Sequence, residues 1–199
     1  MVTNFNHIKK WKRMFDSAVE MEDSLLAATT ELKYKKAIGA SRDVVEHITK
    51  EFTKAAGMTD QDVLNAMERA GKPGKYPTNY GRILAIKETG ILSIESLNNM
   101  FFLNTKGNAG NHTDSELDKM ELADIKMLAE DVYAKLYRET YLFAHQYMPI
   151  IEAQKQKGIS TKNPGAKVSG TQNENSGLGV LLFVLAMLFI FFLVLAQYA

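Results

Sequence analysis

Apolar positions recur at three- and four-residue steps along most of this chain, which is the spacing of one face of an α-helix. The first such stretch runs from Ile8 to Leu32 and predicts one long amphipathic helix or two helices in series. A second predicted helix covers about residues 35–56 and stops at Gly57, a residue type that commonly ends helices. The N-terminal third of the chain is therefore expected to be helical.

Capping residues and glycines mark further, shorter helices. Thr59 is expected to cap a third helix together with Asp62, and Gly71 ends it. The segment KPGKYPTNYG that follows is rich in proline and glycine and predicts a loop. Two more helices are expected, over residues 82–87 and 93–103.

The polar segment NTKGNAGNHTDSE follows and is expected to form a loop between two helices, which is where functional sites usually lie. The last predicted helix of this part runs from about Ser115 to Met148, with Pro149 just beyond it. No segment shows the alternation typical of a strand. The predicted fold class is therefore all-α.

The C-terminal part of the chain predicts a membrane anchor. Residues 178–196 are apolar without interruption, and about 19 helical residues span the roughly 30 Å hydrocarbon core of a bilayer. We therefore expect a helical domain at 1–153, a flexible polar linker at 154–176 and a transmembrane helix at 177–198. Four lysines precede the anchor and no Lys or Arg follows it, which predicts a single-pass protein with a cytoplasmic N-terminal domain: Lys155, Lys157, Lys162 and Lys167.

Composition excludes several classes of function. The formal net charge of +1 lacks the basic excess expected of a duplex-binding protein, so any nucleic-acid contact has to be local. The absence of cysteine excludes disulfides, thiolate metal sites and cysteine nucleophiles. His7 and His145 have no partners at metal-ligand spacing. The sequence indicates neither a metal nor another cofactor.

Three segments, in order, carry a resemblance to a known family: SRDVVEHITKEF, FFLNTKGNAGNH and ELDKMELADIKMLAEDVYAKLY. Together they resemble domain-of-unknown-function family 4145, which is similar in turn to the HEPN superfamily of helical-bundle proteins. The resemblance covers about residues 35–143. Its most specific part is the run from Gly107 to His112, which matches the family's Gly-Asn-x-x-x-His turn. The resemblance implies a helical bundle that commonly pairs as a dimer.

The resemblance also implies a candidate ribonuclease site, because active HEPN proteins carry Arg-x-x-x-x-His. Asn108 and His112 match the polar residue and the histidine of that motif, whereas Gly107 stands where the arginine would be. A histidine can move protons at neutral pH, and a fixed guanidinium stabilises charge on a phosphate. Without that arginine, Lys106 or Arg42 would have to supply the cation.

Other interpretations of these residues stay open. The run from Arg42 to His47 also spells Arg-x-x-x-x-His, but inside a helix the two side chains would point apart. Arg42 instead faces Glu46 and then Lys50, at the spacing of a solvated ion-pair row. The alternative for His112 is a structural histidine that bonds a backbone carbonyl. Asn111 is a candidate binding residue that also suits a turn.

A basic cluster surrounds the tryptophan near the N-terminus. Lys9, Lys10, Lys12 and Arg13 flank Trp11, and this cluster allows two functional interpretations, contact with anionic lipid headgroups or with RNA. A solvated face from which Trp11 packs inward is favoured over both, because Trp11 is in helical phase with the neighbouring apolar residues.

Three functional hypotheses follow. The first is a membrane-anchored HEPN-like binding module without nuclease activity, dimeric, with a surface for a nucleotide, RNA or a protein partner. The second is a metal-independent endoribonuclease, such as a toxin or antiphage effector, that uses His112 with a displaced cation. The third is a small membrane scaffold. The missing arginine and the near-neutral charge favour the first hypothesis.

Overall fold

The computed structural model describes residues 4–158, which lie within a single unit, Met1–Gly165. Within the described residues every regular element is helical and no strand occurs, which confirms the all-α prediction. The elements are η1 (Asn4–Ile8), α1 (Lys12–Leu26), α2 (Glu31–Ala55), α3 (Asp60–Arg69), α4 (Asn79–Glu88), α5 (Ile94–Asn111), η2 (Glu116–Lys119), α6 (Leu122–Leu142), η3 (Phe143–Tyr147) and α7 (Met148–Gln156).

The predicted anchor at 177–198 lies outside the described residues, and so does the predicted linker beyond Gly158. Residues 154–156, which were expected to begin the linker, instead complete α7. Between residues 4 and 158, no helix has both the length and the apolar character needed to cross a bilayer.

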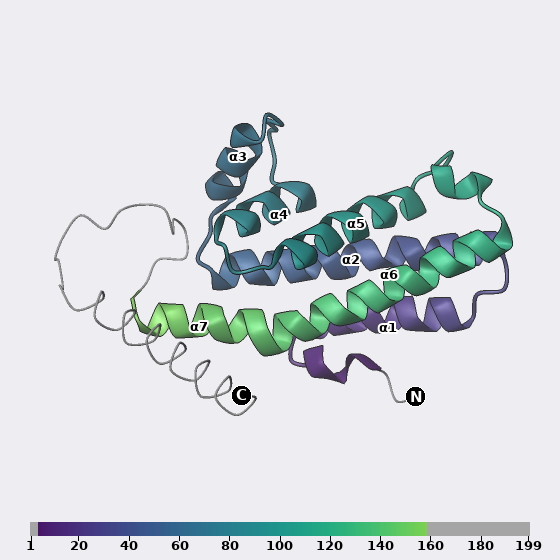
Figure 1. The fold of residues 1–199 in the computed structure, drawn as a ribbon, viewed down its shortest axis with the longest axis horizontal. Coiled ribbons are helices and arrows are strands. Elements are labelled where there is room, and N and C mark those ends of the chain that lie inside the picture. Colours follow the sequence, from purple (N-terminus) through teal and green to yellow (C-terminus); the bar gives the residue numbers. More distant parts are fainter. Residues whose placement is uncertain (1–3, 159–199) are drawn as a thin grey trace, which may run out of the picture. The chain divides into compact units, whose positions relative to one another are not determined.

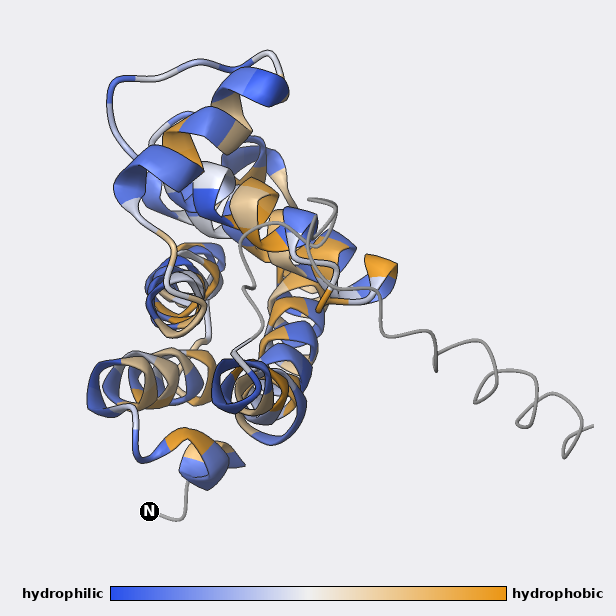
Figure 2. Cartoon of the chain, turned by 90° about the vertical axis from the view of Figure 1, so that its left-hand side faces the viewer, coloured by the Kyte–Doolittle hydropathy of each residue, from blue (hydrophilic) through white to orange (hydrophobic). Residues whose placement is uncertain are grey.

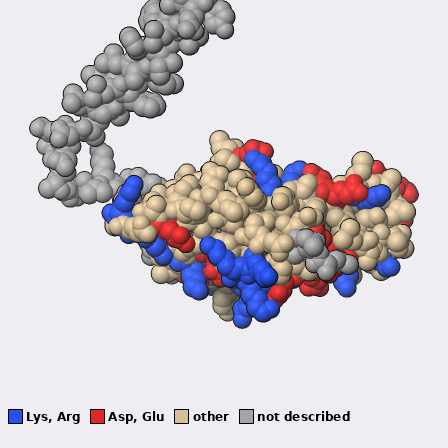
Figure 3. All heavy atoms as spheres, turned by 90° about the horizontal axis from the view of Figure 1, so that it is seen from below, with Lys and Arg blue, Asp and Glu red and all other residues tan. Residues whose placement is uncertain are grey.

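Helix α2 is the centre of the bundle. It packs against α1, α5 and α6, which run roughly lengthwise beside it, while α3 and α4 stand at one end (Figure 1). Apolar positions of the helices lie mostly on the sides that face other helices (Figure 2). Ile38, Val45 and Phe52 of α2 are almost completely buried in the main core. Many Lys and Arg side chains gather on the face that is lowest in Figure 1, which Figure 3 shows from below.

The first predicted helix is divided in two. Helix α1 ends at Leu26, and α2 begins at Glu31 after Thr30, whose backbone is extended. Leu26 and Leu32 are both more than 70% exposed, at 73% and 74%, so neither belongs to the buried face. The third predicted helix is confirmed as α3, since Thr59 and Asp62 form the expected capping box.

The loop predicted after residue 103 is wrong, because α5 continues to Asn111. Its glycines serve helix packing instead of turning the chain. A Cβ at Gly107 would lie 2.9 Å from the Arg42 backbone nitrogen, and one at Gly110 would lie 2.4 Å from the Gly39 nitrogen. The missing side chains therefore let α5 lie directly against the backbone of α2. Asn111 strengthens this contact by donating from Nδ2 to the Gly39 carbonyl oxygen at 3.1 Å.

The last predicted helix is interrupted twice and then continues past Pro149. The single turn η2 and a break precede α6, and the π-helical turn η3 joins α6 to α7. Pro149 lies in the first turn of α7, where a missing N–H removes little. A π-helical turn holds one more residue than an α-helical turn, so η3 changes the path of the helix just before Pro149.

A buried polar network lies between α5 and the end of α6. The Glu139 side chain is 1% exposed and accepts a hydrogen bond at Oε1 from Asn99 Nδ2 at 2.8 Å. Its Oε2 atom is buried and has no hydrogen-bond partner among the described residues. Nearby, the Tyr147 hydroxyl donates to Ser96 Oγ at 2.6 Å. Burial raises the pKa of Glu139 above its ordinary value.

The glycine contact gives the first prediction. Gly110→Ala should lower the free energy of unfolding by about 2 kcal/mol, because overpacking against backbone outweighs the higher helix propensity of alanine. Thr105→Ala, at an exposed position of the same helix, is the control and should change stability by no more than about 0.5 kcal/mol. Urea unfolding of the full chain in mild detergent, followed by Trp11 fluorescence, measures both variants. A stabilised Gly110→Ala protein would contradict the close contact.

Glu139 gives a prediction about pH. Because the pKa of Glu139 is raised in the folded state above 4.5, its contribution to stability is complete below that pH and is lost as pH rises through the folded pKa. Glu139→Gln removes this loss. The difference in free energy of unfolding, variant minus native, should therefore grow as pH rises from about 4.5 to neutral. Exposed Glu130→Gln is the control, and a difference for Glu139→Gln that stays constant with pH would refute the prediction.

Candidate functional site

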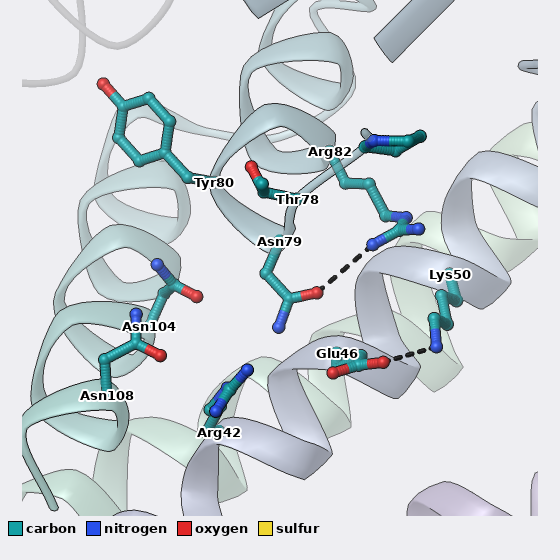
Figure 4. Close-up of a pocket in the computed structure, with 10 residues that line it drawn as sticks. Arg42, Glu46, Lys50, Thr78, Asn79, Tyr80, Arg82, Asn104 and Asn108 are labelled. Carbon is teal, nitrogen blue, oxygen red and sulfur yellow. Dashed lines mark hydrogen bonds and ion pairs between the residues drawn. The ribbon is translucent and has the colours of Figure 1, made fainter. Parts of the chain in front are cut away.

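A cavity of about 420 Å³ lies where α2, α4 and α5 meet (Figure 4). Helix α2 provides side chains from one face, the loop before α4 and its first turn provide a second wall, and α5 provides a third. The lining residues are Arg42, Glu46, Lys50, Pro77, Thr78, Asn79, Tyr80, Arg82, Asn104 and Asn108.

Helical spacing explains why the α2 residues share the cavity. Arg42, Glu46 and Lys50 are separated by four residues, so their side chains project from one face of the helix. The α5 residues Asn104 and Asn108 have the same spacing. They face α2 across the cavity because Gly107 brings the two helices close together at Arg42.

The start of α4 is fixed by a cap and by packing. The Thr78 Oγ1 atom accepts a hydrogen bond from the Gly81 N–H at 3.0 Å. A Cβ at Gly81 would lie 2.4 Å from Met67 Sδ, so the glycine permits α4 to lie against α3. These contacts place Asn79 and Arg82 at the cavity.

The cavity is positively charged, because three cations in its lining face one carboxylate. Glu46 is paired with Lys50, and this hydrogen bond holds the pKa of Glu46 below its ordinary value. Arg82 donates only a long hydrogen bond, 3.4 Å, to Asn79 Oδ1. Arg42 is half-buried and makes no hydrogen bond or ion pair within the part of the chain that the structure describes. Arg82 and Arg42 also lower the pKa of Glu46 through their charge, but one carboxylate among three cations leaves the cavity lining with an excess of positive charge.

The α5 wall adds amide groups that are also unpartnered. Asn104 is 6% exposed, yet neither it nor Asn108 makes a side-chain hydrogen bond to another residue between 4 and 158. Both amides point into the cavity in Figure 4. Neither amide is among the enclosed polar atoms that lack a partner, so both are accessible from the cavity, where a polar ligand can bond them.

Tyr80 is part of the cavity lining, but its ring points away from Arg42 and Arg82 (Figure 4). The Tyr80 ring lies 5.2 Å from the Phe101 ring, and Lys72 Nζ lies 4.7 Å from the Tyr80 ring centroid. The cavity lining contains no histidine, and its one carboxylate is held charged by Lys50. The arrangement is therefore suited to hold an anion and offers no group that exchanges protons near neutral pH.

The structure separates the site residues predicted from sequence into two groups. Arg42 and Asn108 line the cavity. His112 does not: it is an exposed residue with extended backbone that ends α5, and its N–H donates to the Ala109 carbonyl oxygen. Lys106 forms an ion pair with Glu116 at 2.5 Å and is also outside the lining.

The remaining sequence-predicted residues have other places. Asn111 bonds to Gly39 on α2. Lys9, Lys10 and Arg13 are exposed around the start of α1, on a part of the surface that contributes nothing to the cavity lining. His47 is half-buried and does not line the cavity, although Arg42 does.

Sequence reasoning missed Lys50, Arg82, Asn79 and Asn104 as site residues. The four-residue spacing of Arg42, Glu46 and Lys50 was visible, but it is equally typical of a solvated helix face. Nothing local indicated that α4 would begin beside them. The N-cap residue Thr78, three residues before Gly81, is the one sequence feature that could have marked that start.

The histidines near the N- and C-terminal ends of the domain do not form a metal site. The His7 and His145 rings lie 6.3 Å apart, and His7 Nε2 is hydrogen-bonded to Thr140 Oγ1 at 3.0 Å. Burial lowers the pKa of His7. Among residues 4–158, no group of three or more His, Asp or Glu side chains is placed to hold a metal ion.

Comparison of the chain with models of protein families, with curated proteins and with solved structures found no match. The chemistry of the α2–α4–α5 cavity is therefore the basis on which a function can be argued.

Proposed function

We propose that this protein is a membrane-anchored, HEPN-like binding module whose α2–α4–α5 cavity holds the phosphate groups of a nucleotide or of RNA, without cleaving them. The main support for the proposal is the Arg42 guanidinium, which makes no hydrogen bond or ion pair within residues 4–158 and lines the same cavity as the Asn104 and Asn108 amides. Donors of both kinds are complementary to phosphate oxygens.

Electrostatics favours an anion as the occupant. Arg42, Lys50 and Arg82 repel one another across the cavity, and only Glu46 offsets them. A phosphate would pair with the two arginines, whose planar guanidinium groups match its oxygens in bidentate geometry. The N-terminus of α4 adds N–H donors and a favourable dipole for the same charge.

The size of the cavity supports a ligand larger than a lone ion. Its volume of about 420 Å³ falls within the roughly 300–1,000 Å³ of small-molecule sites. The Tyr80 ring does not take part, because it points away from Arg42 and Arg82 (Figure 4) and packs against Phe101. The phosphate groups of a nucleotide or of an RNA segment would provide the anion.

The membrane part of the proposal rests on sequence. The apolar run at 178–196 and the lysines that precede it favour an anchor with the helical domain on the cytoplasmic side. The resemblance to family 4145 adds the expectation of a homodimer formed by the domain.

The endoribonuclease alternative gains no support from the described geometry. It needs a cation close to His112, but Lys106 is paired with Glu116, and Arg42 lines a cavity that His112 does not reach. No described contact favours the scaffold alternative either. The binding module is the one hypothesis with a built site.

Binding can be tested with a short, fluorescein-labelled single-stranded RNA and the full chain in mild detergent. Arg42→Ala and Arg82→Ala should each weaken binding about tenfold, because a hydrogen bond to a charged group contributes about 1.5 kcal/mol or more. Arg69→Ala is the matched control, since Arg69 pairs with Glu88 outside the cavity lining.

Fluorescence anisotropy measures the affinities, and unlabelled ADP as competitor tests whether a nucleotide occupies the same site. Equal affinity of the Arg42→Ala, Arg82→Ala and native proteins for both ligands would refute the proposal.

Cleavage is tested separately. The full chain incubated with end-labelled RNA should leave it intact on a denaturing gel, because the cavity lining lacks a proton-transfer group. His112→Ala should give the same result and the same RNA affinity as the native protein. Cleavage by the native chain that disappears in His112→Ala would instead establish the endoribonuclease alternative.

A further inference from the structure

A basic and aromatic surface lies on the opposite side of the bundle core from α4, around the start of α1. Lys9, Lys10 and Arg13 are exposed there. Figure 3, which shows the molecule from below, has a group of Lys and Arg side chains on this face. We call this region the η1–α1 surface; it comprises Lys9, Lys10, Trp11, Lys12, Arg13 and the adjoining aromatic patch described next.

The aromatic patch is built by η1 and the end of α6. The His7 ring lies 5.2 Å from Tyr137 and 5.6 Å from Tyr141, and the Tyr141 ring lies 4.4 Å from His145. Tyr137 and Tyr141 remain 38% and 47% exposed, respectively. These rings are therefore clustered but not buried, and each carries a polar atom.

Trp11 joins the patch to the basic residues. Its ring lies 4.8 Å from Phe143, which follows Tyr141 by two residues, and Lys10 Nζ lies 4.1 Å above the Trp11 ring. Lys12 is paired with Asp16 at 2.9 Å. No such pair is present for Lys9, Lys10 or Arg13 within residues 4–158. The surface thus combines unpaired cations with half-exposed amphipathic rings.

We infer that the η1–α1 surface docks the domain on the anionic headgroups of a lipid bilayer. Lys and Arg are attracted to an anionic leaflet, and Trp and Tyr rings favour the interface between water and hydrocarbon. This combination of cations and aromatic rings distinguishes the η1–α1 surface from the α2–α4–α5 cavity, which is concave and contains amide groups. The inference rests on the proposed anchor, because the anchor supplies the bilayer.

The course of the chain favours a membrane over RNA at this surface. Helix α7 begins three residues after His145 and ends at Gln156 with Lys155 in its last turn. From there about 20 residues lead to the predicted anchor, a length that spans roughly 25 Å as a flexible chain. An anchor on such a tether would keep the whole domain near a bilayer, so docking would cost little further translational freedom.

Docking can be followed through Trp11, the one tryptophan of the chain. The full chain is reconstituted into vesicles of phosphatidylcholine, alone or with phosphatidylserine at about a third of the lipid, together with a dansyl-labelled lipid. Energy transfer from Trp11 to dansyl should be higher in the anionic vesicles, and high salt should abolish the increase.

The triple variant Lys9→Glu, Lys10→Glu, Arg13→Glu should show the same energy transfer from Trp11 to dansyl in both kinds of vesicle. The control variant reverses the charge of three other exposed lysines, Lys54, Lys75 and Lys87, and should keep the native difference in energy transfer between the two kinds of vesicle. Equal transfer by the native chain in both vesicles would overturn the docking. So would a native difference that persists in the η1–α1 variant.

Two further measurements distinguish failure of the proposed anchor from failure of the lipid docking. Vesicle flotation tests the anchor: a chain that floats with neither vesicle overturns both the anchor and the docking. Anisotropy with the labelled RNA tests the alternative partner. If the η1–α1 variant loses RNA affinity as strongly as Arg42→Ala while its energy transfer is native, the surface binds RNA and the lipid inference is wrong.

Discussion

The direct contact between the backbones of α2 and α5 is the constraint on which the candidate site depends. Gly39, Gly107 and Gly110 leave no room for a Cβ where the helices meet. The close approach of the two helices sets Asn108 and Asn104 of α5 opposite Arg42 of α2. Any side chain at Gly107 would strike the Arg42 backbone and move the amides away from the guanidinium. Packing of residues without functional groups therefore determines the geometry of the polar cavity.

The uncompensated charge of the cavity is maintained by the same kind of neutral packing. Helix α4 is fixed by the Thr78 cap and by the fit of Gly81 against Met67, and neither contact involves a charge. Arg82 is thereby held in the lining of the same cavity as Arg42, although the two repel. Similar unpartnered groups elsewhere in the described chain, such as Glu139 Oε2, are enclosed by the core. Arg42 and Asn104 differ because they line a cavity that a ligand can enter.

Local sequence features were sufficient to predict those parts of the fold that depend on capping and on helical periodicity. The Thr59–Asp62 capping box set the start of α3, and the apolar phase of α2 gave its buried face. The segment from Asn104 to Asn111 was wrongly expected to be a loop, because its glycines and asparagines have low helix propensity and contact with α2 overrides that preference. Arg42 could be chosen from sequence, whereas Arg82 joins it only through the packing of α3 and α4. His112 was predicted from the resemblance of the run Gly107–His112 to a family motif, whereas the structure places it exposed at the end of α5 and outside the cavity lining.

If Arg42 and Arg82 together hold a phosphate, the side-chain Nε–Hε resonances of the two arginines report on it most directly. The measurement is an NMR titration of the ¹⁵N-labelled full chain in mild detergent with the short RNA. We expect the Arg42 and Arg82 resonances to shift together and saturate, while those of Arg69 and Arg138, which are paired with Glu88 and Glu95, stay in place. A titration that leaves Arg42 and Arg82 unchanged while RNA binds would contradict the proposal.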